Sequence, residues 1–256
     1  MVWFDRGLSP LSRFILDCLF FPRCISCGIR LPSEGPRAVP GEDPLPSLGG
    51  DGDGAGLLCG RCRLSLEKAP GRSDEILPGV PVLAPFIAGP VIVELVRFLK
   101  FEGGTSCAGA LGACMARTLR RSAGGLPCDG CILAPVPLHR SRRASRGYNQ
   151  AELLARAAAG ILGAEVNSGL LERTRRTREQ SRLRGERRRR NVEGAFALRE
   201  GASAAGRDVV IVDDLVTTGC TARQCAAAVL AVRPASVRVL AAGMARRLDP
   251  YRAHPI

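Results

Sequence analysis

The chain has 256 residues, of which 46% are hydrophobic and 24% charged, and this composition is typical of a globular protein. It excludes a disordered chain, a collagen and a coiled coil, and the length suffices for one α/β domain with a small appendage or for two modest domains. The formal net charge of +13 suits phosphorylated ligands or a nucleic-acid backbone.

The N-terminal segment is predicted to form a short amphipathic helix. Apolar residues recur at helical spacing from Leu8 to Leu19, and the helix ends before Pro22. We expect its apolar face to dock on the rest of the chain rather than on a membrane or a partner.

No secretory signal or membrane-spanning segment is predicted. Charged residues at positions 5, 6, 13 and 17 interrupt the N-terminal segment, so it lacks the continuous apolar run of a secretory signal. The longest apolar stretch, 80–96, holds three prolines and Glu94, so we predict a cytoplasmic protein without membrane insertion.

Four cysteines form two Cys-x-x-Cys pairs. They are Cys24, Cys27, Cys59 and Cys62. In a reducing compartment such pairs hold metal more often than they form disulfides, and this spacing favours a tetrahedral structural zinc ion. The Gly/Pro-rich segment 33–56 between the pairs is predicted to be a mobile loop. Reduced structural cysteines are the alternative, a redox role is disfavoured, and the third pair, Cys128 and Cys131, lacks the partners for a second site.

Beyond the cysteine pairs, apolar strands alternate with amphipathic helices. The predicted strands are 82–87, 131–138, 209–212 and 237–243, and the predicted helices are 91–99, 108–119, 150–162 and 221–232. This alternation predicts an α/β fold with a mostly parallel sheet flanked by helices, in which ligands bind at the carboxyl ends of the strands. We therefore divide the chain into an N-terminal module, 1–75, and an α/β domain, 76–256.

The segment 209–221 is the most informative part of the sequence. Its apolar run predicts a buried parallel strand, and Asp213 and Asp214 follow at the ligand-binding end. Two buried acids need partners, and sugar hydroxyls together with a magnesium-bearing ligand would supply them. The next residues, 217–221, turn into a helix, so their N–H groups and threonine hydroxyls can converge on one phosphate, with Gly219 permitting the tight turn. The pattern is neither a Walker loop nor Gly-x-Gly-x-x-Gly.

These thirteen residues closely resemble the signature of type I phosphoribosyltransferases. In that family the acid pair binds the ribose hydroxyls of phosphoribosyl pyrophosphate, and the Thr-Thr-Gly turn holds its 5-phosphate. The resemblance implies a type I phosphoribosyltransferase fold with this ligand bound by Asp213, Asp214, Thr217, Thr218, Gly219, Cys220 and Thr221. Magnesium would accompany the ligand. Cys220 departs from the family, in which Gly or Ala is usual at this position.

Two further segments narrow the resemblance. Residues 135–139, Pro-Val-Pro-Leu-His, lead through arginines into 147–150, Gly-Tyr-Asn-Gln, and a later stretch precedes Ala195-Phe196. That stretch includes Thr177, Gln180, Leu183, Arg188 and Asn191. With the four-cysteine N-terminus, the combination resembles the ComF family, whose members are associated with natural competence and DNA uptake in bacteria. It implies a DNA-uptake helicase or single-stranded DNA as partners.

Basic residues near the predicted ligand end are candidates for pyrophosphate contacts. The loop after Leu138 faces the same end of the sheet as Asp213, so Arg140, Arg143 and Arg146 are placed to neutralise pyrophosphate. Lys100 matches the lysine of a Lys-aromatic-x-Gly segment in the family, which suggests a similar role. His139 is either an acid/base group or a satisfied loop histidine.

Segment 172–190 carries ten arginines against three glutamates. Residues within it recur at helical spacing, which suggests a basic lid over the site. The alternative is a nucleic-acid contact surface, although no aromatic residue is present for base stacking. Two hypotheses remain open at this point: a pentosyl transferase, for which Asp213 and Asp214 are the catalytic candidates and the acceptor is unknown, and a non-catalytic adaptor of the DNA-uptake machinery.

Overall fold

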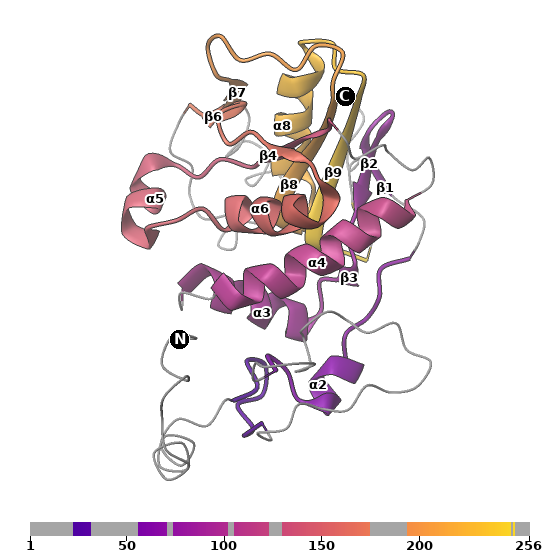
Figure 1. Ribbon diagram of the computed structural model, residues 1–256, viewed down its shortest axis with the longest axis vertical. Coiled ribbons are helices and arrows are strands. Elements are labelled where there is room, and N and C mark those ends of the chain that lie inside the picture. The colour runs from indigo at the N-terminus through magenta and orange to yellow at the C-terminus, as the bar shows by residue number, and fades with distance from the viewer. Residues whose placement is uncertain are drawn as a thin grey trace, which may run out of the picture. The chain divides into compact units, whose positions relative to one another are not determined.

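The computed structural model describes residues 23–31, 56–70, 74–101, 105–122, 130–174, 194–246 and 248 (Figure 1). The predicted N-terminal helix, Cys128, nearly all of the Gly/Pro-rich insert and the arginine-rich residues 175–190 lie outside this set. The chain divides into two compact units, Met1–Ser65 and Leu66–Ile256. Within the described residues, no helix is both long enough and apolar enough to cross a bilayer.

The described part of the first unit is a pair of tight turns beside one short helix. Residues Arg23 and Arg30 form an antiparallel bridge around the first cysteine pair. Within that turn the N–H of Gly28 donates to the carbonyl of Cys24 at 2.8 Å. Helix α2, Gly60–Leu64, has Cys59 of the second pair as its N-cap and contains Cys62.

The second unit is built on a seven-stranded sheet in the order β1-β2-β9-β8-β4-β5, with β3 pairing with the end of β9. The strands are β1 Asp74–Leu77, β2 Val80–Leu83, β3 Phe86–Ile87, β4 Ile132–Pro135, β5 Glu165–Val166, β8 Asp208–Val216 and β9 Ser236–Met244. Among the described strands of this sheet, only β1 and β2 pair antiparallel. The remaining pairs are parallel, so the predicted mostly parallel α/β fold is confirmed.

Proline residues set where two of the predicted strands end. The strand expected at 82–87 is divided into β2 and β3 around Pro85, which has no N–H for the ladder. The strand expected at 131–138 ends at Pro135, although the N–H of Val136 still donates to the carbonyl of Val212 at 2.9 Å, and Pro137, which has no N–H, follows. A separate two-stranded sheet, β6 Leu171–Arg173 with β7 Phe196–Leu198, has no counterpart among the predicted elements.

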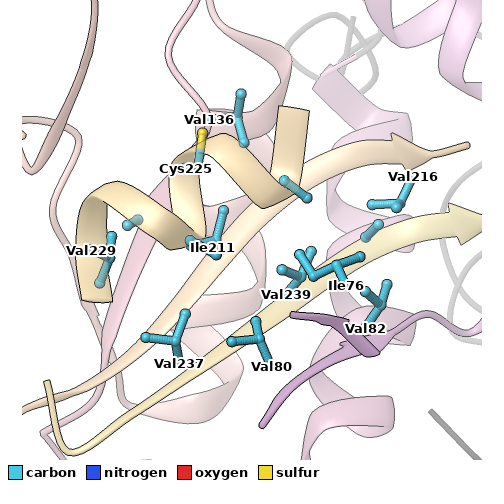
Figure 2. Packing of buried hydrophobic residues seen from close by; sticks show 14 of the residues in the cluster. Ile76, Val80, Val82, Val136, Ile211, Val216, Cys225, Val229, Val237 and Val239 are labelled. Atoms are coloured by element: carbon cyan, nitrogen blue, oxygen red, sulfur yellow. The ribbon is translucent and has the colours of Figure 1, made fainter. Parts of the chain in front are cut away.

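Helices cover both faces of the sheet. The described helices of the second unit are α3 Pro90–Phe101, α4 Thr105–Arg121, α5 Arg140–Arg146, α6 Gln150–Leu162 and α8 Cys220–Leu230. One face packs on α8, where Ile211, Val237 and Val239 meet Cys225 and Val229 (Figure 2). The opposite face contacts α4 and α6. Side chains alternate between the faces of a strand, so neighbouring residues of β8 point towards different helices.

The edges of β8 create an opening at its carboxyl end. On one side β8 pairs with β9 as far as Val216. On the other side its ladder with β4 ends where Val212 pairs with Pro135. Among the described strands, none pairs with the last four residues of β8, Asp213 to Val216, on the β4 side, and such carboxyl ends are where parallel sheets commonly bind ligands.

Candidate functional site

A cleft of about 480 Å³ lies at the carboxyl end of β8. Its walls come from α3, from the residues that follow β4, from α5 and from the loop that leads into α8. Its charged lining residues are Arg97, Lys100, Arg142, Arg146, Arg173, Asp213 and Asp214. Five cations and two acids give the cleft an excess of positive charge, which suits a ligand with several negative charges.

The two acids of β8 enter the cleft from opposite faces of the strand. Asp213 lies on the α8 side, where its charge acts on the thiol of Cys225 and on Arg173. Burial, together with the negative charge of Asp214, raises the pKa of Asp213 to about 7. The carboxylate of Asp213 also accepts a hydrogen bond from the N–H of Asp214 at 2.8 Å. Asp213 can therefore change protonation near neutral pH.

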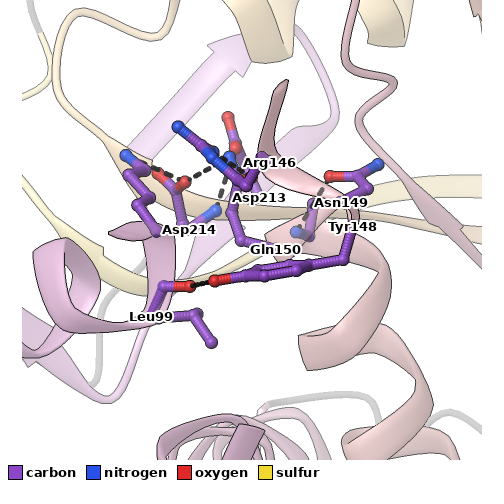
Figure 3. A network of polar contacts seen from close by, with 9 residues as sticks. Leu99, Arg146, Tyr148, Asn149, Gln150, Asp213 and Asp214 are labelled. Atoms are coloured by element: carbon purple, nitrogen blue, oxygen red, sulfur yellow. Dashed lines mark hydrogen bonds and ion pairs between the residues drawn. The ribbon is translucent and has the colours of Figure 1, made fainter. Parts of the chain in front are cut away.

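Asp214 lies on the α6 side and is 5% exposed. Its Oδ2 is 3.0 Å from Nζ of Lys100 in α3. The same oxygen accepts a hydrogen bond at 2.8 Å from Nε2 of Gln150, the first residue of α6. Gln150 in turn accepts from Arg146 at 2.6 Å (Figure 3). A buried carboxylate held by a cation and an amide donor is satisfied, which explains how an acid is accommodated at this depth.

The loop 217–219 connects the acids to helix α8. Gly219 is the N-cap of α8, with φ of +72°, a conformation that an L-residue rarely adopts. A Cβ at this position would also come within 2.9 Å of Cγ2 of Ile76. The hydroxyl of Thr218 lies 3.3 Å from Sγ of Cys220. Residues 217–221 all line the cleft beside the positive end of α8, as expected for a phosphate cradle.

The arginines predicted to contact pyrophosphate lie on different faces of helix α5. Arg146 lines the cleft, where its guanidinium stacks over the ring of Phe101 at 5.2 Å. Arg142, one turn earlier, also lines the cleft. Arg140 and Arg143 do not line it, and Arg143 instead lies 3.7 Å from Glu152. The structure thus brings Lys100 and Arg146 to the acids and leaves the other two predicted contacts outside.

His139 has a structural role in this arrangement. It is the N-cap of α5, and its Nδ1 accepts a hydrogen bond from the N–H of Ser141 at 3.2 Å. The same nitrogen is 2.8 Å from the hydroxyl of Ser141. His139 does not line the cleft. Of the two interpretations of His139, the structure supports a residue with local hydrogen bonds rather than an acid/base group.

Four polar or charged cleft residues, Arg97, Arg142, Gln150 and Arg173, were not among the predicted contacts. Arg142 lies in a segment that the sequence analysis predicts to be a loop, but which forms helix α5. Residues 142 and 146 are four apart, and this helical spacing could have indicated that Arg142 shares a face with Arg146. Gln150 appeared only as part of the family resemblance. Arg173 lies on β6, with its guanidinium 5.1 Å from the ring centre of Phe196. Burial lowers the pKa of Arg173 to about 10, and the charge of Arg142 acts in the same direction.

The four cysteines of the first unit converge. The Sγ atoms of Cys24, Cys27, Cys59 and Cys62 all lie within 4.8 Å of one another. Two of these atoms, in Cys27 and Cys59, are 3.7 Å apart. A tetrahedral zinc site with bonds of about 2.3 Å has sulfur atoms about 3.8 Å apart, so the donor set and its spacing are consistent with zinc. Cys131 is buried in the second unit.

Curated relatives of this chain are described by their use of DNA. The DNA utilization protein YhgH of Salmonella typhi is 34% identical over 236 residues, covering 91% of this chain and 95% of that protein. YhgH of Escherichia coli is 34% identical over 185 residues, covering 72% and 76%. Competence protein F of Haemophilus influenzae is 37% identical over 90 residues, covering 35% and 39%. No protein-family model matches the chain.

Solved structures align with the chain at low TM-scores. Adenine phosphoribosyltransferase from Leishmania tarentolae is 17% identical with a TM-score of 0.33, covering 66% of this chain and 78% of that one. AQ2163 from Aquifex aeolicus is 14% identical with a TM-score of 0.37, covering 64% and 86%.

Proposed function

Since this chain belongs to the YhgH/ComF family of DNA-utilization and competence proteins, we propose that it is a cytoplasmic protein that binds phosphoribosyl pyrophosphate and Mg²⁺ in its cleft in the service of DNA uptake and natural transformation. The observation that carries the proposal is that Asp213, Asp214 and the loop 217–221 line one cleft together with Lys100 and Arg146. Adjacent carboxylates suit sugar hydroxyls, and a helix N-terminus suits a phosphate.

The carboxylates also fit a magnesium-bearing ligand. Magnesium prefers oxygen ligands and is usually held by one or two carboxylates together with substrate phosphates. Asp213 and Asp214 offer such oxygens at the floor of the cleft, beside Lys100. When bound, Mg²⁺ would neutralise charge on the pyrophosphate. The residues that would hold the ligand itself are the two aspartates at the sugar, the loop 217–221 at the 5-phosphate, and Lys100 with Arg146 at the pyrophosphate.

The same arrangement supports pentosyl transfer when an acceptor is present. The bond between C1 of the ribose and the pyrophosphate oxygen breaks, an acceptor nucleophile forms a bond to C1, and the electron pair leaves with pyrophosphate. Lys100, Arg142 and Arg146 lie where they would stabilise the charge that develops on the leaving group. Asp213 and Asp214 would orient the sugar and offset positive charge on its ring.

Calorimetric titration of the protein with phosphoribosyl pyrophosphate and Mg²⁺ tests the proposal. We expect binding by the unmodified chain and none by the double variant Asp213→Asn with Asp214→Asn. Glu165→Gln is the matched control, because Glu165 pairs with Arg207 at the amino end of the sheet, away from the cleft. Absence of binding by the unmodified chain, or equal binding by the double variant, contradicts the proposal. Release of pyrophosphate from labelled donor distinguishes turnover from binding.

A second function is favoured by the relatives' own descriptions and by the exposed arginines of α5. Arg140 and Arg143 leave a basic surface beside the cleft entrance that has no role in the first proposal. An adaptor of the DNA-uptake machinery would use such a surface to contact single-stranded DNA or a helicase. In that case capture of a single-stranded oligonucleotide or of a helicase is unchanged in the double aspartate variant. Loss of capture in that variant ties the partner to the cleft instead.

For the four-cysteine unit we propose structural zinc. The donors are four thiolates at tetrahedral spacing, with no open coordination position of the kind that catalytic zinc requires. Metal content measured on the purified protein tests this, and a ratio well below one zinc per chain contradicts it.

A further inference from the structure

Gln150 lies between two charged groups that belong to different walls of the cleft. Its Nε2 donates to Oδ2 of Asp214 at 2.8 Å, and its Oε1 accepts from Arg146 at 2.6 Å (Figure 3). A carboxylate only accepts hydrogen bonds and a guanidinium only donates them, so these neighbours dictate the orientation of the amide. At 6% exposure Gln150 has little access to water that could replace either partner. A neutral amide is the side chain that satisfies both contacts.

The backbone at Gln150 is fixed from two directions. Asn149 caps α6 by accepting from the N–H of Ala151 at 3.1 Å, and its amide donates to the carbonyl of Val136 at 3.0 Å, just beyond β4. Tyr148 donates its hydroxyl to the carbonyl of Leu99 at 2.6 Å, at the end of α3. The backbone just before Gln150 is therefore anchored to the end of β4 and to the end of α3. From there its side-chain amide contacts Asp214 of β8 on one side and Arg146 of α5 on the other.

Each charged partner of Gln150 also has a second anchor. Asp214 is paired with Lys100, and Arg146 stacks over Phe101. Without the amide both charges would stay in the cleft, held only by residues near the end of α3. The distance and orientation between the two side chains would no longer be fixed. Gln150 thus sets the spacing of Asp214 and Arg146, whereas Lys100 and Phe101 are enough to keep the two side chains in the cleft.

Resting on the proposed function, we propose that Gln150 is a positioning residue that holds the sugar-side carboxylate of Asp214 and the pyrophosphate-side guanidinium of Arg146 at a set spacing. The cleft then favours a ligand that carries a sugar hydroxyl and a diphosphate in one molecule over either group alone. Such a ligand binds most tightly when Asp214 and Arg146 are already held at the right spacing. If the two side chains were flexible, ordering them on binding would lower the affinity.

Calorimetry with three probes tests the inference on the full chain. The probes are phosphoribosyl pyrophosphate, ribose 5-phosphate and inorganic pyrophosphate, each with Mg²⁺. For Gln150→Leu we expect affinity for the first probe to fall about tenfold, while the affinities for the two fragments change much less. Each fragment contacts only one of the two residues, ribose 5-phosphate Asp214 and pyrophosphate Arg146, so it does not depend on their spacing. Phosphoribosyl pyrophosphate must contact both at once. Cooperative urea unfolding of the variant checks that it folds.

Gln150→Glu supplies a readout that a purely structural role would not move. The introduced carboxylate keeps the contact with Arg146 but repels Asp214, with Asp213 next to it and Lys100 opposite. Affinity for phosphoribosyl pyrophosphate is therefore expected to fall further than in Gln150→Leu, whereas affinity for inorganic pyrophosphate, which needs only Arg146, should change little.

The outcomes separate the two proposals. If the unmodified chain does not bind phosphoribosyl pyrophosphate, the proposed function fails and this inference fails with it. If the unmodified chain binds, and Gln150→Leu weakens all three probes by the same factor or leaves the joined ligand unaffected, Gln150 does not set the spacing and only this inference is overturned. Equal losses of affinity for phosphoribosyl pyrophosphate and for inorganic pyrophosphate in Gln150→Glu also overturn it.

Discussion

Nζ of Lys100 lies 3.0 Å from Oδ2 of Asp214, and the lysine side chain is 27% exposed whereas the aspartate side chain is 8% exposed. The pair therefore joins a half-buried cation that can reach solvent to an acid that cannot. The acid depends on its partners, because a buried carboxylate without compensation is costly. The lysine is free to turn to a phosphate once a ligand supplies hydroxyls to Asp214.

Lys100→Met is expected to lower the free energy of unfolding by about 1–3 kcal/mol, because Asp214 then keeps only the amide of Gln150. Adding Asp214→Asn should restore much of this loss, since the uncompensated charge is removed. Arg156→Met is the control, because its pair with Glu152 is exposed on the arginine side and contributes little. Urea denaturation measures all four proteins. Equal stability of Lys100→Met and the unmodified chain would show that Asp214 does not need the lysine.

The raised pKa of Asp213 predicts two opposite responses to pH. Between about pH 4 and 7 the folded chain holds a proton on this carboxyl that the unfolded chain has lost, so stability falls as pH rises through this window. Ligand affinity should rise over the same window, because the ionised form accepts hydrogen bonds from sugar hydroxyls. Below the pKa the affinity contributed by Asp213 falls by about tenfold per pH unit.

Comparison with Asp213→Asn isolates these effects from the titration of the ligand and of other groups. The difference in stability between the two proteins should change with pH across the window and become constant above about pH 7. Denaturation midpoints and calorimetric titrations at a series of pH values give both curves. A difference that does not vary with pH means that Asp213 is ionised throughout.

Local sequence patterns predicted the parts of the site that are contiguous in the chain. The strand, the acid pair and the loop 217–221 are neighbours in sequence, and the structure brings them to one cleft. The cysteine pairs were found by spacing alone, and their convergence is confirmed. Membership in the ComF family, inferred from the motifs, is also confirmed.

The remaining cleft residues depend on tertiary structure. The strand was expected to end at Val212 because the acids interrupt its apolar run, but pairing with β9 continues it to Val216. Arg173 enters the cleft because β6 pairs with β7, more than twenty residues later, and these strands are too short to leave a periodic pattern. Gln150 reaches Asp214 across 64 positions of sequence.

Gly219→Ala should destabilise the chain and weaken phosphate binding. The positive φ costs about 1–3 kcal/mol for a residue with a Cβ, and that Cβ would press on Ile76. Adding Ile76→Ala relieves the contact but leaves the backbone strain. Gly160→Ala is the control, because Gly160 is helical and has open space around it, so this change should stabilise α6 slightly. Thermal unfolding and ribose 5-phosphate titration measure both effects, and an unaltered Gly219→Ala protein would argue against a strained cradle.

Removal of metal should unfold the four-cysteine unit and spare the sheet. Few apolar residues of that unit are buried in the described segments, so we expect its turns to depend on the proposed metal. Hydrogen exchange should speed up at the N–H groups of Cys24, Gly28 and Arg63, which close these turns. Amides of β8 and β9 should stay protected. Cys27→Ser is expected to reproduce the effect of chelation, whereas Cys114→Ala, a buried change in α4, should retain the metal. Unchanged exchange after chelation would show that the unit folds without it.

The arginines of α5 offer a matched test of where pyrophosphate binds. Arg146 faces the cleft between Gln150 and Phe101, so Arg146→Ala should weaken pyrophosphate binding about tenfold. Arg143 is three residues earlier, 62% exposed and directed at Glu152, so Arg143→Ala should leave that affinity nearly unchanged. Both variants lose one positive charge from the same short helix, so long-range electrostatic effects are similar. Equal losses would mean that α5 acts through its net charge, and a larger loss at Arg143 would place pyrophosphate on the outer face of the helix.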